Sequence, residues 1–216
     1  LWSRMNAPDE RNRIRLAMRC LLLEGHGRRI LVDVGLGAKF DAKSREIYRV
    51  EDEPALENSL AARGLSTADI SDVILTHLHF DHAGGATALV DGRLVPRLAN
   101  ARYHVQKRNW DNAHAPNPRE RASYMPENFD PLAEAGVLDF WDGAGEPWPG
   151  LELIPAQGHT RGQQLVRVSG GGQSLSHLAG LNPLPPHARL PLVLAYPLPA
   201  PPPRADQPPH PPGPPP

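Results

Sequence analysis

The chain has 216 residues and a formal net charge of −1, with no sustained basic run. Because proteins that wrap nucleic acid need a positively charged surface, this charge pattern argues against a nucleic-acid partner. The single cysteine, Cys20, permits neither an internal disulfide nor a thiolate metal site, which fits a reducing compartment. No apolar run is long enough to span a bilayer and no signal-type segment is present, so we expect a cytoplasmic protein with no membrane partner.

The composition divides the chain into two parts. Residues 1–182 have the mixed composition of a packed domain, whereas nearly half of residues 183–216 are proline. Proline lacks the backbone N–H that regular helices and internal strands require. We therefore predict one folded domain over residues 1–182 and an irregular tail over residues 183–216, which is either native or a degraded C-terminus. The chain begins with Leu1 rather than methionine, and we expect the domain to be incomplete at both termini.

The spacing of apolar residues predicts an α/β domain in which strands outnumber helices. Residues 15–25 and 28–37 have the pattern of a β-hairpin. A loop over residues 39–52 and a helix over residues 53–64, ending at Gly64, come next. A buried strand over residues 71–77 precedes a helix over residues 83–89. Further strands are predicted over residues 102–106, 137–141, 151–156, 163–170 and 173–181, with a long irregular insertion over residues 110–125.

Three histidines and an aspartate fall within six residues at the end of the strand predicted over residues 71–77. If the chain stays extended there, His77 and His79 point the same way, because side chains two apart in a strand share a face. Asp81 and His82 then lie where the chain turns into a helix. Imidazole nitrogens and carboxylate oxygens are the usual ligands of zinc and similar metals, and a site without cysteine leaves room for an exchangeable water. The pattern indicates a catalytic metal site rather than a group of capping residues.

The segment THLHFDH resembles the first motif of the metallo-β-lactamase superfamily, and the resemblance covers residues 13–181. It implies a four-layer αββα sandwich with a one- or two-metal site on the rim between two sheets. It also implies a third histidine in a downstream Gly-His-Thr loop, and the stretch AQGHTRGQQ supplies His159. By this resemblance His77, His79 and His159 bind one metal, while Asp81 and His82 contribute to a second. The lactonase-like branch of the family is the most similar.

The resemblance also has gaps. Asp33 matches an early aspartate of the family that is structural or orients a ligand imidazole, and a loop-capping role explains it equally well. Gly180 stands where the family usually supplies a bridging aspartate, and Arg161 replaces a frequent proline. The family's last histidine has no clear counterpart, because His187 and His210 lie in no matching motif. We therefore expect a complete first metal site and an incomplete second one.

Four other residues that could bind a metal or act in catalysis are predicted to have no such role. Cys20 lies in an apolar run and is predicted to be a small buried side chain. His26, His104 and His114 lie in turn, strand and loop contexts, and we interpret them as structural or surface residues. The insertion over residues 110–125 could be a lid, a substrate wall or an interface element.

The sequence thus leads to a hypothesis: a metal-dependent hydrolase that uses a metal-activated water on an ester, lactone, thioester or amide of small-molecule size. The metal is Zn²⁺, in one or two copies, with iron or manganese left open, and Asp81 is the catalytic residue that orients the water. One alternative is a metal-binding scaffold that is catalytically impaired because the second site is incomplete. Another is an oxidoreductase that holds iron in similar ligands. The sequence leaves the oligomeric state open.

Overall fold

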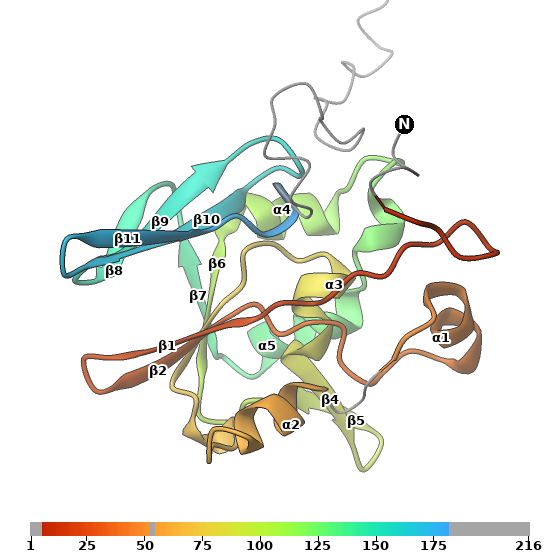
Figure 1. Ribbon diagram of the computed structural model, residues 1–216, viewed down its shortest axis with the longest axis horizontal. Helices are drawn as coiled ribbons and strands as arrows, with labels where there is room; N and C mark the ends of the chain where they lie inside the picture. Colours follow the sequence, from red (N-terminus) through yellow and green to blue (C-terminus); the bar gives the residue numbers. More distant parts are fainter. Residues whose placement is uncertain (1–5, 52–54, 182–216) are drawn as a thin grey trace, which may run out of the picture.

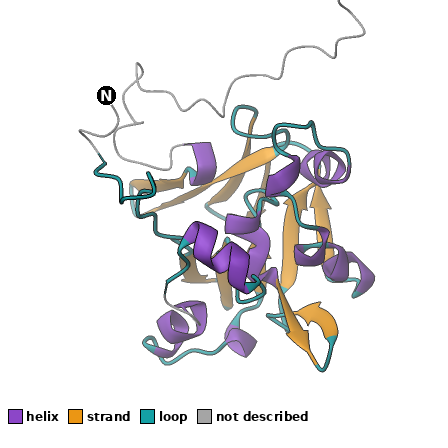
Figure 2. Cartoon of the chain, turned by 90° about the vertical axis from the view of Figure 1, so that its right-hand side faces the viewer, coloured by secondary structure: helices purple, strands orange, loops and turns teal. Residues whose placement is uncertain are grey.

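The structure is a computed structural model that describes residues 6–51 and 55–181. Two β-sheets lie one over the other, and helices pack on the side of the first sheet that faces away from the second (Figure 1). Figure 2 shows most of the helices gathered in front of the strands when the molecule is turned by 90°. No helix of the described ranges is both long and apolar enough to cross a membrane. The tail predicted over residues 183–216 lies outside the described residues.

The first sheet has the strand order β1-β2-β3-β6-β7. Its strands are β1 (Leu21–Gly25), β2 (Arg28–Val32), β3 (Asp72–Ile74), β6 (Arg102–Gln106) and β7 (Leu138–Trp141). The first two form an antiparallel hairpin, whereas β2, β3, β6 and β7 run parallel. Parallel strands bring their carboxyl ends to one edge, which is where α/β proteins place their ligands. The segments that follow β2 and β3 therefore meet at the same edge.

The second sheet is antiparallel and has the order β11-β10-β9-β8. Its strands are β8 (Gly145–Trp148), β9 (Leu151–Ala156), β10 (Gln163–Gly170) and β11 (Gln173–His177). The backbone N–H of Gln164, near the start of β10, donates to the carbonyl of Thr76 at 2.9 Å. This bond ties the β9–β10 loop to the segment that follows β3.

The helices are α1 (Ala42–Tyr48), α2 (Ala55–Ala61), α3 (Phe80–Ala83), α4 (Lys107–His114) and α5 (Asp130–Glu134). A small hairpin, β4 (Thr87–Val90) with β5 (Arg93–Pro96), follows α3. Alternate residues of β2 show how the layers are built: Val32 packs between the two sheets, and Leu31 packs toward the helices. Each fully buried aliphatic side chain of this kind stabilises the fold by roughly 1.5–3 kcal/mol. The α/β sandwich expected from the sequence is therefore present.

The helix predicted over residues 83–89 is wrong. Helix α3 begins earlier, at Phe80, and ends at Ala83, and the chain becomes strand β4 at Thr87. The chain makes a single 3₁₀ turn over Gly84–Ala86, and Thr87–Val90 then pairs with β5, which ends the helical stretch. Glycine at position 84 lets this turn pack against the loop after β2, because an added Cβ would lie 2.2 Å from the carbonyl oxygen of Leu36.

Three other expectations need correction. The loop predicted over residues 39–52 contains helix α1, whose N-cap Asp41 accepts a hydrogen bond from the backbone of Ser44 at 2.7 Å. The first strand begins at Leu21, and residues 15–20 lie outside it. The insertion over residues 110–125 is helical up to His114 and irregular only after it. Strands β4, β5 and β8 were not predicted, because they are too short to give a clear periodic pattern in the sequence.

Candidate metal centre

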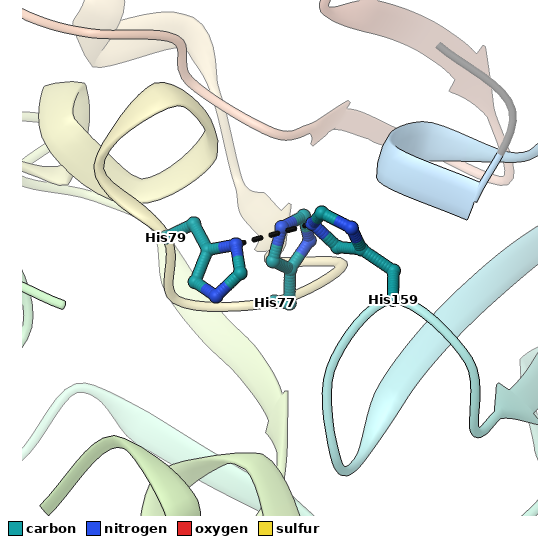
Figure 3. Close-up of side chains that lie close together, drawn as sticks. All are labelled: His77, His79 and His159. Atoms are coloured by element: carbon teal, nitrogen blue, oxygen red, sulfur yellow. Dashed lines mark hydrogen bonds between the residues drawn. The ribbon is translucent and has the colours of Figure 1, made fainter. Parts of the chain in front are cut away.

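Three histidines from two loops converge at the edge where β3 ends (Figure 3). His77 lies between β3 and α3, His79 is the N-cap of α3, and His159 lies in the β9–β10 loop. Nδ1 of His79 is 3.1 Å from Nε2 of His159, and the ring of His77 is centred 4.6 Å and 4.8 Å from the other two rings. One donor atom of each residue lies within 4.8 Å of the others.

A second group shares His77 and adds Asp81 and His82, again with one donor atom each within 4.8 Å. Nε2 of His82 lies 3.4 Å from Oδ2 of Asp81, and the rings of His77 and His82 are centred 4.1 Å apart. The structure therefore brings together all five side chains that the sequence singled out. The short helix α3 explains why, because it places Asp81 and His82 one turn beyond the extended segment that carries His77.

Hydrogen bonds orient two of the imidazoles and leave one nitrogen of His77 without a proton. Nδ1 of His82 donates to Oδ2 of Asp33, 2.7 Å away, and Nε2 of the same ring faces Oδ2 of Asp81 at 3.4 Å. The hydroxyl of Thr76 donates to Asp33 at 2.8 Å, so it accepts from Nδ1 of His77, 3.1 Å away. Nε2 of His77 is then a bare acceptor, and it is buried without a hydrogen-bond partner in the described structure. Asp33 thus orients one imidazole directly and a second through Thr76.

The electrostatics of the centre favour neutral imidazoles at two positions. Burial, followed by the neighbouring histidines, lowers the pKa of His159 to about 4 and that of His77 well below its usual value. His82 differs: burial opposes its charge, but the carboxylate of Asp33 outweighs it and raises the pKa to about 10. Burial also works against ionised Asp81, yet the hydrogen bond from His82 lowers the pKa of this carboxyl.

The donor set fits a divalent cation of the zinc type. Zinc binds neutral imidazole nitrogen and carboxylate oxygen, which are the atoms that converge here. A buried imidazole nitrogen without a partner, such as Nε2 of His77, costs free energy that a bound cation offsets. The chemistry of the residues therefore suits a metal at the first group and, once His82 gives up a proton, at the second, which shares His77 with the first.

Gly180 packs directly against His159. A Cβ added to this glycine would lie 2.7 Å from both Cδ2 and Nε2 of the imidazole. Gly180, which the sequence analysis aligned with the family's bridging aspartate, therefore lies beside the cluster and offers no side-chain ligand atom. His187 and His210 lie outside the described residues.

The remaining candidates lie apart from the cluster. His104 is buried with its Nε2 3.0 Å from Asp72, His26 occupies the turn between β1 and β2 with φ +50°, and exposed His114 pairs with Asp130 at 2.9 Å. Burial raises the pKa of the Cys20 thiol to about 12, which is the behaviour of an inert side chain.

Sequence reasoning missed the contribution of the insertion. Tyr124 forms an isolated β-bridge with His79, and the two rings are centred 4.7 Å apart. Glu120 approaches the same histidine from the far side, with Oε2 3.8 Å from Nε2. No motif marks either residue, because both lie in an irregular segment about 40 residues downstream of the histidine cluster.

Comparisons with known proteins agree with this geometry. The family model described as metallo-beta-lactamase superfamily matches residues 17–205. A Mycobacterium tuberculosis protein named "Probable metallo-hydrolase" is 31% identical over 189 residues, covering 77% of this chain and 57% of that protein. An N-acyl homoserine lactonase from Bacillus thuringiensis is 28% identical over 165 residues, covering 72% of this chain and 59% of the lactonase.

Solved structures give the same result. A probable metal-dependent hydrolase from Staphylococcus aureus superposes with a TM-score of 0.76 at 28% identity, covering 83% of this chain and 64% of that one. AidC, a dizinc quorum-quenching lactonase in complex with a product, superposes with a TM-score of 0.60 at 26% identity, covering 76% of this chain and 56% of AidC. This chain thus spans less than two thirds of the length of these relatives. By sequence, fold and the convergence of its histidines, it belongs to the metallo-β-lactamase superfamily.

Proposed function

We propose that the protein is a metal-dependent hydrolase in which His77, His79 and His159 hold one divalent metal, and Asp81 and His82 contribute to a second. The observation that supports this most is the convergence of imidazole donors from two loops about 80 residues apart, with the other nitrogen of His77 and His82 already engaged. Zinc is the favoured metal because the donors are imidazole and carboxylate without cysteine. When bound, such a cation supplies Lewis acidity and lowers the pKa of water toward neutrality.

Two carboxylates of the chain have further roles in the proposed reaction. The carboxylate of Asp81 is ionised at neutral pH, so its oxygens accept a hydrogen bond from the attacking water and can take its proton. Asp33 holds His82 in one orientation through the 2.7 Å contact. Asp81 is therefore the catalytic residue of the proposal, and Asp33 is a positioning residue.

We propose an ester or a lactone with an apolar substituent as the substrate, ahead of a thioester or an amide. Two aromatic side chains, Tyr48 and Phe80, lie along the broad, open hollow that also borders His79, Asp81 and His159. Their rings are centred 5.1 Å apart, and Tyr48 is 48% exposed, so part of this wall is open to a ligand. Apolar walls with a few convergent polar groups are typical of small-molecule sites. The lactonases among the relatives support the same class.

Gly180 favours a second candidate, a metal-binding scaffold with impaired catalysis. The glycine touches His159 and supplies no carboxylate between the two groups of donors. In this alternative the first metal binds and the second is weak, so water is held without being positioned for attack.

Metal content and turnover separate the two candidates. Protein purified without chelator is analysed by mass spectrometry for metal stoichiometry and assayed against an aryl ester, N-hexanoyl homoserine lactone, a thioester and a β-lactam. The same measurements are made on His77→Ala and on His114→Ala, in which an exposed histidine outside the cluster is removed.

The hydrolase proposal expects about two metals per chain and turnover of the ester or lactone that is lost in His77→Ala and kept in His114→Ala. At most one metal with no turnover supports the scaffold instead. Protein that binds no zinc, iron or manganese contradicts both. An iron content with a visible absorption band favours oxidoreductase chemistry.

A further inference from the structure

The segment between β6 and β7 packs against the histidine loop rather than lying over it as a detached lid. Oδ1 of Asn109, in helix α4, accepts a hydrogen bond from the backbone of Leu78 at 2.9 Å. Tyr124, at the other end of the segment, pairs with His79 through an isolated β-bridge. Both residues flank the same turn of chain, so this segment is part of the frame that holds His79.

Within this segment, one carboxylate is fixed by several donors. The side chain of Glu120 is 13% exposed. Its Oε1 accepts from the amides of Asn117 at 2.7 Å and Asn112 at 3.2 Å, and its Oε2 accepts from the hydroxyl of Thr160 at 2.7 Å. Donors from two neighbouring elements therefore hold the carboxylate in one orientation.

That orientation directs Oε2 of Glu120 toward His79. Nδ1 of His79 faces Nε2 of His159, while its Nε2 is buried, makes no hydrogen bond and lies 3.8 Å from Oε2. This distance is within ion-pair range and exceeds a normal N–H···O hydrogen bond by about 1 Å. A proton on Nε2 would leave the lone pair of Nδ1 directed at the cluster.

The same arrangement exists elsewhere in the site. Asp33 lies 2.7 Å from Nδ1 of His82 and leaves Nε2 of that ring directed at Asp81. Histidines that bind metals commonly give their other N–H to a carboxylate, which fixes the tautomer and raises the basicity of the ligand. Glu120 stands in this relation to His79, but it comes from a different part of the chain.

We propose that Glu120 is a positioning residue that sets the tautomer and orientation of His79 for metal binding. The inference rests on the proposed function, because it requires His79 to be a metal ligand. Glu120 also holds Thr160, the neighbour of His159, so a single carboxylate links the two loops that carry the first group of donors. The insertion is therefore predicted to be a structural part of the metal centre.

The test compares Glu120→Gln, which keeps the shape and removes the charge, with Glu120→Asp, which keeps the charge on a shorter side chain. Asp111→Asn is the matched control, because Asp111 is an exposed carboxylate of the same segment that pairs with Lys107. Thr160→Val is the structural control, because it removes the hydroxyl that bonds Glu120 and leaves the carboxylate. Each variant is measured by zinc affinity in competition with a chelator, by the visible spectrum of the Co²⁺-substituted protein and by thermal unfolding of the metal-free form.

We expect Glu120→Gln to weaken zinc binding 10- to 100-fold, roughly the range for loss of such a partner, and to shift the Co²⁺ bands. Glu120→Asp should recover part of the affinity, and Asp111→Asn should bind as the parent does. Glu120→Gln that binds zinc within twofold of the parent with an unchanged Co²⁺ spectrum overturns the proposal. Thr160→Val should lose less affinity than Glu120→Gln, because the carboxylate and its two amide donors remain. A Glu120→Gln variant that loses zinc affinity together with the thermal stability of its metal-free form, with an unshifted Co²⁺ spectrum, also overturns the proposal, because the role would then be structural. A parent protein that binds no metal contradicts the proposed function itself, so the two failures are distinguishable.

Discussion

Two buried groups of histidine and carboxylate in the described part of the chain differ in how their ring nitrogens are satisfied. His104, in β6, has both ring nitrogens engaged: Nε2 lies 3.0 Å from Oδ1 of Asp72, and Nδ1 accepts from the indole of Trp141 at 3.4 Å. Asp72 in turn pairs with Arg28 at 2.8 Å. In the metal centre, by contrast, Nε2 of His77 is buried with no hydrogen-bond partner among the described residues.

The contrast shows how a structural histidine differs from a ligand. Burying a polar nitrogen is tolerated when it is hydrogen-bonded, and His104 satisfies that condition within its own layer of the fold. His77 satisfies it at Nδ1 only, through Thr76. The feature that predicts a metal ligand is a buried nitrogen without a hydrogen-bond partner. The number of nearby carboxylates does not predict one.

The largest effect should come from breaking the satisfied group. His104→Ala removes a buried ring and its hydrogen bonds with Asp72 and Trp141, although Asp72 keeps Arg28, and we expect a loss of about 3 kcal/mol in the free energy of unfolding of the metal-free protein. His79→Ala should cost less under the same conditions, because its nitrogens make fewer favourable contacts without metal. Urea denaturation in the presence of a chelator measures both. An equal or larger loss for His79→Ala would contradict the distinction between the two groups.

Removing the carboxylate that orients His82 should act on metal binding. In Asp33→Asn, the amide cannot serve as the same acceptor for both Nδ1 of His82 and the hydroxyl of Thr76. We expect the second zinc equivalent to bind 10- to 100-fold more weakly, and the first to change less. Isothermal titration of zinc into metal-free protein resolves the two steps, with Asp111→Asn as the charge-matched control. Unchanged affinity for the second equivalent would show that Asp33 only caps its loop.

A smaller effect is expected at Gly180. In Gly180→Ala the new Cβ would lie 2.7 Å from the ring of His159, so the imidazole must move. We expect affinity for the first metal to fall about tenfold, since ligand geometry at such sites is exacting. Gly170→Ala, where the added Cβ meets nothing within 4 Å, is the control. Equal affinities for the two variants would indicate that His159 has room to shift. The same crowding predicts that Gly180→Asp does not simply restore a second metal site.

The smallest effect concerns pH. The pKa of His159 is lowered to about 4 in the fold, against 6.5 for an ordinary histidine. His159 therefore becomes protonated below about pH 6.5 in the unfolded chain but only below about pH 4 in the folded chain. The free energy of unfolding of the metal-free protein falls as the pH is lowered through this window. Between pH 7 and pH 5, we expect the free energy of unfolding of His159→Gln to fall by roughly 1 kcal/mol less than that of the parent, allowing for partial exposure of the ring. Urea denaturation at the two pH values tests this, and equal losses would contradict it.

The sequence predicted which side chains converge better than it predicted the local structure around them. His77, His79, Asp81 and His82 are close in the chain, and their spacing relates directly to an extended segment followed by a turn. The helix expected over residues 83–89 is wrong because Thr87–Val90 pairs with β5 instead, and this pairing has no clear local signature. Short strands such as β8 were missed for a similar reason, because β8 is defined by its pairing with β9 and not by a periodic pattern.

What the sequence determined alone was the set of donor types and the loop that carries most of them, because metal-ligand chemistry depends on residue identity and local spacing. The resemblance to a family added His159, which spacing alone could not place. Only the tertiary structure decided which nitrogens are left bare, that Asp33 serves two imidazoles, and that Glu120 faces the buried side of His79. The contacts of Asp33 with Thr76 and His82, and of Glu120 with His79, join residues about 40 or more positions apart, and chain packing rather than local preference brings them together.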